Sequence, residues 1–128
     1  RYLTSYPIMN LDQFSNLQLP EGFRLLGVEF VDLPMLDAIG RPALARAVIE
    51  NGTIAIYLAR DQTPAEMSVS IYHEVLEAMT VAVFSPPPAV CDLNEAGFEQ
   101  AAMDAHRRYG LANAASVLTF LRDFGFTD

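Results

Sequence analysis

The pattern of apolar and polar positions predicts two β-strands in the first half of the chain. Residues 23–31 and 53–59 are rich in β-branched and aromatic residues, which favour strands. In the second segment Ile54, Ile56 and Leu58 alternate with smaller or polar residues and therefore share one face. Both segments are expected to contribute one apolar face to a common core.

The segments around these strands have weaker patterns. Residues 1–22 look irregular, because prolines and a glycine interrupt any periodicity. Residues 32–50 are interpreted as a helical stretch in two pieces, with Gly40 and Pro42 as the break. Asn51-Gly52 tolerates the left-handed conformation that ends many helices, so it is assigned as the cap of this stretch.

Three helices are predicted in the second half. Thr63-Pro64-Ala65-Glu66 is a capping box with proline at the first helical position, and it begins a helix over residues 63–84 that a proline run terminates. Asp92-Leu93-Asn94-Glu95 is interpreted as a second capping box, and its helix should end near Gly110. A last helix is expected over residues 114–124.

These elements favour a single α+β domain over residues 1–128. We expect a small sheet, containing residues 23–31 and 53–59, to pack against the helix at residues 63–84. The later helices should cover the other side. The helix at residues 63–84 is apolar on nearly all sides, which is typical of a buried helix.

Composition narrows the classes of partner. The chain has 128 residues, 52% of them hydrophobic, so it can bury a core. Its net charge of −8 argues against nucleic acid or an anionic membrane as a partner, because both require a basic surface. Nothing in the sequence indicates the oligomeric state.

Cysteine content bears on compartment and on metal chemistry. Cys91 is the only cysteine, which excludes an internal disulfide and a cysteine-based zinc knuckle and fits a reducing compartment. No stretch has the length of a membrane span or the character of a signal peptide. We therefore expect a cytoplasmic protein. Cys91 itself is expected to be a small buried residue rather than a nucleophile.

The strongest chemical signal lies in the middle of the buried helix. Residues 73–77 read His-Glu-Val-Leu-Glu, one residue away from the H-E-x-x-H motif of zinc peptidases. His73 and Glu77 are four residues apart on a helix, so both can reach one ion. Glu74 lies where the motif places its general base.

A simpler interpretation treats the same residues as a solvated face. A polar stripe follows helical spacing along this helix and could face water without any chemical role. Its members are Glu66, Ser70, His73, Glu77 and Thr80.

The order of elements over residues 53–108 resembles the core of the zincin metallopeptidases: a strand, a capped turn, a helix bearing H-E, a proline-rich loop and a helix opening with Asn-Glu-Ala. In the branch whose third ligand is a glutamate, that residue lies on the later helix. The resemblance implies metal ligands at His73, Glu77 and Glu95, with Glu74 as catalytic base. It also implies that Glu99 orients the metal-binding histidine, and that residues 53–59 form the edge strand along bound peptide.

Each added residue also has a structural interpretation. Glu95 would be the third helical residue of a capping box, and Glu99 could pair with a neighbour on a solvated face. His106 lies in a last helical turn, where positive charge is favourable, and it is interpreted as structural.

The substitution of glutamate for the second histidine makes the ligand set richer in oxygen. Zinc is still the expected divalent ion, and manganese and iron(II) become alternatives, since carboxylates suit harder ions. Three outcomes stay open: an active hydrolase, an ion site without turnover, or a degenerate cluster without metal. A small acidic module that packs on a partner protein is the non-enzymatic rival.

Overall fold

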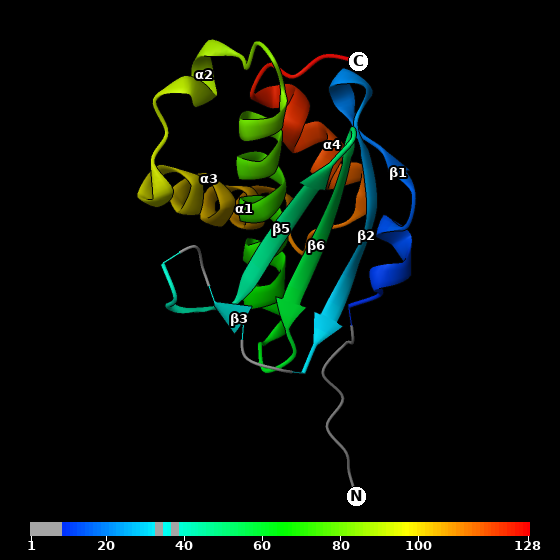
Figure 1. Cartoon of the computed structure of the whole chain (residues 1–128), viewed down its shortest axis with the longest axis vertical. Helices are drawn as coiled ribbons and strands as arrows, with labels where there is room; N and C mark the ends of the chain where they lie inside the picture. Colours follow the sequence, from blue (N-terminus) through cyan, green and yellow to red (C-terminus); the bar gives the residue numbers. More distant parts are fainter. Residues whose placement is uncertain (1–8, 33–34, 37–38) are drawn as a thin grey trace, which may run out of the picture.

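A mixed four-stranded sheet forms one layer of the protein (Figure 1). The computed structural model describes residues 9–32, 35–36 and 39–128. The strand order is β1 (Leu17–Gln18), β2 (Arg24–Val31), β6 (Thr53–Ala59) and β5 (Ala45–Glu50). β2 and β6 are parallel, whereas β5 is antiparallel to β6. The strands expected at residues 23–31 and 53–59 are thereby confirmed.

The helical interpretation of residues 32–50 is wrong for the described part of that segment. It contains β3 (Met35–Leu36) and β4 (Pro42–Ala43), which pair with each other, and then β5. Asn51-Gly52 is not a helix cap but the turn of the hairpin that joins β5 to β6. Both residues have positive φ, 49° and 80°, as the tight hairpin turns of Asn-Gly sequences require.

The position of β6 also differs from the expectation. β6 pairs with β2 on one side and β5 on the other, so it is an interior strand and not the edge. β5 is the edge of the sheet as described. Any extended ligand added at this side of the sheet would therefore pair with residues 45–50 rather than with residues 53–59.

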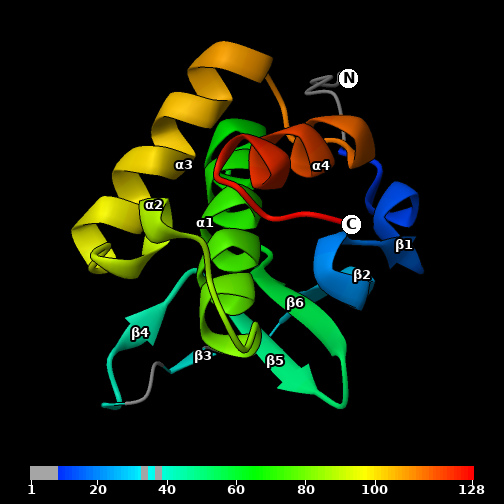
Figure 2. The same ribbon diagram turned by 90° about the horizontal axis from the view of Figure 1, so that it is seen from above.

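Within the described residues, four helices lie on one side of the sheet (Figure 2): α1 (Pro64–Ala82), α2 (Pro88–Cys91), α3 (Glu95–Tyr109) and α4 (Ala114–Asp123). α1 begins with the predicted capping box, since Thr63 and Glu66 each bond the other's backbone N–H. α3 begins differently from the prediction. Asn94, not Asp92, is its N-cap and accepts from the N–H of Gly97, so Glu95 is the first helical residue.

The core lies between the sheet and α1. Ile54, Ile56 and Leu58 are fully buried on the face of β6 that meets α1, as their alternation predicts. α1 is in turn covered by α3 and α4, and its residues 71–73, 75–76 and 78–79 are buried. The α+β class, with a small sheet packed on a central helix, is confirmed.

The segment before β2 is less irregular than expected where it is described. It holds two 3₁₀ turns, η1 (Leu11–Phe14) and η2 (Pro20–Gly22), on either side of β1. Residues 1–8 lie outside the described residues. None of the described helices combines the length and the apolar character needed to cross a lipid bilayer.

Candidate metal centre

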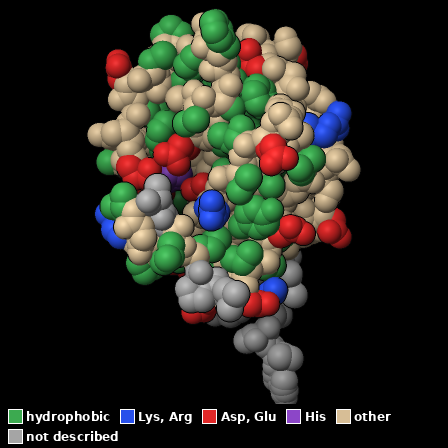
Figure 3. Space-filling view, viewed as in Figure 1, with side chains coloured by type: hydrophobic (Ala, Val, Ile, Leu, Met, Phe, Trp, Pro, Cys, Tyr) green, Lys and Arg blue, Asp and Glu red, His purple; other side chains and the backbone are tan. Residues whose placement is uncertain are grey.

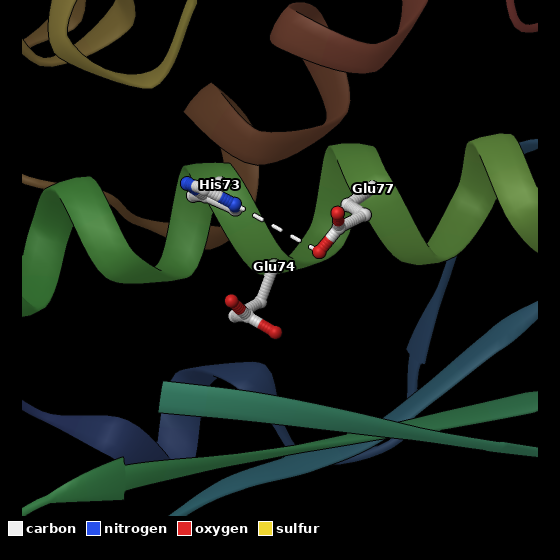
Figure 4. A group of neighbouring side chains, drawn as sticks. All are labelled: His73, Glu74 and Glu77. Atoms are coloured by element: carbon white, nitrogen blue, oxygen red, sulfur yellow. Dashed lines mark ion pairs between the residues drawn. The ribbon is translucent and has the colours of Figure 1, made fainter. Parts of the chain in front are cut away.

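The middle of α1 carries His73, Glu74 and Glu77 in one small group (Figure 4). One ligand atom from each lies within 4.8 Å of the others. The side chain of His73 is only 8% exposed, because α3 covers this turn of the helix. The alternative interpretation, a polar stripe that faces solvent, is therefore wrong for His73, the middle residue of that stripe.

Glu99 holds the imidazole from one side. The N–H at Nδ1 of His73 donates a hydrogen bond of 2.7 Å to Oε1 of Glu99, the expected partner. This bond fixes the orientation of the ring and leaves Nε2 directed at the remaining acids. Glu99 is thus placed as a residue that orients His73, on the helix turn that follows Glu95.

Glu95 faces the other ring nitrogen. Its Oε1 lies 2.9 Å from His73 Nε2, although the direction of the contact is not that of a hydrogen bond. Nε2 is the one buried side-chain nitrogen or oxygen of the described residues that lacks such a partner. Because Asn94 caps α3, the carboxylate of Glu95 is not used in capping and is available to the cluster.

Glu77 completes the group from α1. Its Oε1 lies 3.8 Å from His73 Nε2. Burial is the main cause that raises the pKa of Glu77, and the charge and hydrogen bond of Glu95 raise it further. Two carboxylates from different helices are therefore held close together, which costs free energy unless a proton or a cation lies between them.

Glu74 points from α1 toward the strands (Figure 4). Burial raises the pKa of Glu74 to about 7, and the charges of Glu77, Glu95 and Glu99 raise it further while His73 lowers it. A carboxylate with a pKa near neutrality can both accept and release a proton under ordinary conditions.

His73 balances these acids in the metal-free protein. Burial, the largest influence, lowers its pKa, but the hydrogen bond to Glu99 and the charges of the three other acids outweigh it. The pKa of His73 is raised as a result, so a proton on Nε2 offsets part of the negative charge. A divalent cation at the same place would offset more of it.

The cluster lies in an open cleft of about 1090 Å³. One wall is the acidic group on α1 and α3, and the other is residues 41–47 of β4, β5 and the residues around them. Figure 3 shows the hollow, with a histidine side chain surrounded by acidic side chains and basic side chains close by. The cleft is large enough for an extended peptide segment rather than an ion alone.

The second wall was missed in the sequence. Its signal is the spacing of Ala43, Ala45 and Ala47, which puts small residues on one face of a strand just before an Asn-Gly turn. Alanine is also a good helix former, so the same residues favoured the prediction of a helix.

Two other candidates lie elsewhere. His106 Nδ1 is 2.8 Å from the hydroxyl of buried Ser68, in agreement with its structural interpretation. Cys91 is exposed at the end of α2, so the expectation of a buried cysteine is wrong. Residues 88–91 form one short turn outside the core, which leaves the thiol on the surface.

The donor set fits a divalent cation. The imidazole of His73 is buried, its Nδ1 is bonded to Glu99, and its Nε2 has no hydrogen-bond partner but faces carboxylates. Metal ions in proteins are bound by such groups of imidazole and carboxylate side chains. Comparison of the chain with family models, with curated proteins and with solved structures finds no match. The assignment of function therefore depends on this geometry.

Proposed function

We propose that this chain is a zincin-like, metal-dependent hydrolase domain that acts on peptides. The observation that carries the proposal is the buried His73, whose Nε2 faces the carboxylates of Glu77 and Glu95 but has no hydrogen-bond partner. Without an ion, that nitrogen would keep only ion-pair contacts and no hydrogen bond, which is unfavourable in a buried site.

His73, Glu77 and Glu95 would hold the ion, and Glu99 would orient His73. One nitrogen and two carboxylates suit zinc, and they suit manganese or iron(II) better than the usual two-histidine set does. When bound, a divalent ion would polarise a scissile carbonyl and make water easier to deprotonate.

Glu74 would be the general base. Its carboxylate is half-buried beside the ligands, and its pKa of about 7 lets it accept a proton from water near neutral pH. The same proton would then pass to the leaving amine, as the reversible role of a base at this pKa allows.

The edge strand β5 supplies a place for the peptide backbone. Leu44 accepts a hydrogen bond from the N–H of Ala59, so the even-numbered residues from 44 onward exchange their backbone hydrogen bonds with β6. In an antiparallel ladder the intervening residues direct their N–H and C=O groups to the opposite side. Those of Ala45 and Ala47 are directed toward the cleft, where an extended peptide can pair with them.

A second function is favoured by one observation. The ligand atom of Glu74 lies within the same 4.8 Å group as those of His73 and Glu77, so Glu74 could be a ligand instead of a base. The chain would then be a catalytically inactive zincin-like module that binds an ion or a partner protein.

Metal binding is tested first. Zinc, manganese or iron(II) should bind the full chain at about one ion per chain and raise its melting temperature, since the ion binds only the folded state. Glu95→Gln should reduce affinity at least tenfold, because it replaces a charged ligand with a neutral amide of equal size. Affinity would be measured by competition with a chelating dye.

Glu29→Gln is the matched control, because this exposed residue of β2 lies outside the cleft and loses the same charge. Equal loss of affinity in both variants, or no binding by the wild type, would contradict the metal site. The metal-loaded wild type should also cleave a mixed peptide library scored by mass spectrometry. Binding without cleavage would favour the inactive module.

A further inference from the structure

We infer that the cleft selects peptides with an acidic side chain, and that Arg46 on the edge strand is the residue that recognises it. The inference uses the strand edge of the proposed function and names the substrate class that this edge accepts. It does not depend on turnover.

Arg46 is placed at the rim of the cleft. It lies in the middle of β5, is exposed, and belongs to the wall opposite the acidic cluster. Its neighbours Ala45 and Ala47 are half-buried against α1 and the core, so the side chain of Arg46 is on the outer face of the sheet, level with Tyr57 of β6. Arg41 lines the same wall.

Arg46 also differs from the arginines that lie outside the cleft. Within the described part of the chain, no hydrogen bond, ion pair or ring contact engages it. Those other arginines each bond an acceptor, pair with an acid or stack on an aromatic ring: Arg24, Arg60, Arg107, Arg108 and Arg122.

The ladder geometry gives the contact that Arg46 would make. A peptide running antiparallel to β5 would bond the backbone of Ala45 and Ala47, so its residue opposite Arg46 would belong to a non-hydrogen-bonded pair. Side chains approach most closely in such pairs. An opposite charge at that position stabilises the pairing of the two strands.

The charge distribution also favours one register. Side chains on the inner face of the bound strand would lie toward Glu74 and Glu77, where an anion is repelled. Side chains on the outer face would lie beside Arg46. An acidic residue is therefore stabilised on one face and excluded from the other.

Two neutral-dye-labelled octapeptides test this, one of alternating Thr and Glu and the other of alternating Thr and Gln. Binding to the full chain would be measured by fluorescence anisotropy at low salt, with chelator present so that no metal-dependent cleavage occurs. In Arg46→Ala, the affinity for the Thr-Glu peptide relative to that for the Thr-Gln peptide should be roughly two- to fivefold lower than in the wild type. Arg46→Glu should shift it further and favour a Thr-Lys peptide.

Arg122→Ala is the matched control, because it removes the same charge from α4, and its ratio should equal that of the wild type. An unchanged ratio in Arg46→Ala would overturn the inference and leave Arg46 as a charge that protects a strand edge. Failure of all three peptides to bind the wild type would overturn it too. Neither metal content nor cleavage enters this measurement, so a failure of the hydrolase proposal is seen separately.

Discussion

At the scale of single residues, the position of Glu74 separates it from the other acids of the cluster. Glu77 and Glu95 approach Nε2 of His73, and Glu99 bonds Nδ1, so three acids surround the imidazole. The side chain of Glu74 instead points toward the sheet. Glu74 therefore lies between the group around His73 and the β5 wall of the cleft, where a base beside an extended peptide would lie.

Glu74→Gln distinguishes base from ligand. If Glu74 is the base, the variant should keep its metal content and lose turnover by about 10² or more, since an amide cannot accept the proton. Elemental analysis and peptide cleavage would be compared on the same preparation. A variant that loses the ion together with activity would identify Glu74 as a ligand and support the inactive module.

At the scale of elements, the β5–β6 hairpin builds the cleft. Its turn holds β5 at the sheet edge, and the backbone of β5 then faces the acidic turn of α1. Gln62 secures the other end of the wall, because its amide donates to the carbonyls of Leu44 and Ala59 and accepts from Ser70 of α1. Gln62 thereby connects the segment before β5 and the end of β6 to α1, one helical turn before His73.

Gly52→Ala should weaken this hairpin. Gly52 has φ of 80°, where a Cβ is unfavourable although nothing lies within 4 Å of it, so the cost is backbone strain of about 1 kcal/mol. Urea denaturation measures the loss. Gly52→Asn should lose less, because asparagine tolerates positive φ. Equal stability of the alanine variant and the wild type would contradict the turn conformation described for this position.

At the scale of the whole molecule, the stability of the metal-free protein should depend on pH through the buried cluster. The pKa of Glu74 is about 7 in the folded protein and close to 4.5 when unfolded, and the pKa values of His73 and Glu77 are also raised. The folded state therefore binds more protons than the unfolded state between these values. The contribution of these groups to the free energy of unfolding is fully present below pH 4.5 and is lost as the pH rises through 7.

Urea denaturation of the metal-free chain at pH 5, 6, 7 and 8 should show a falling free energy of unfolding. Glu74→Gln should flatten this trend, since its side chain does not titrate. Saturating manganese should reverse the trend, because an ion replaces the protons and binds more tightly as they leave. A metal-free wild type that gains stability from pH 5 to 8 would contradict the buried cluster.

Local signals in the sequence determined where α1 begins and which of its side chains share a face. The Thr63 to Glu66 capping box needs only neighbouring residues to form, and the spacing of His73 and Glu77 puts both on one helical face wherever the helix lies. The alternation of Ile54, Ile56 and Leu58 likewise predicts their buried face. Such features depend on contacts within a few residues, and the sequence is sufficient for them.

Only the tertiary structure decided the conformation of residues 45–50 and the surroundings of His73. Ala-Arg-Ala-Val-Ile-Glu is compatible with helix or strand, and pairing with β6 across the Asn51-Gly52 turn selected the strand. The choice of Asn94 over Asp92 as the cap of α3 directed Glu95 at Nε2, and burial in the folded protein raised the pKa of Glu74. These outcomes depend on which distant segments pack together and how much water they exclude, so they appear only when the chain is folded.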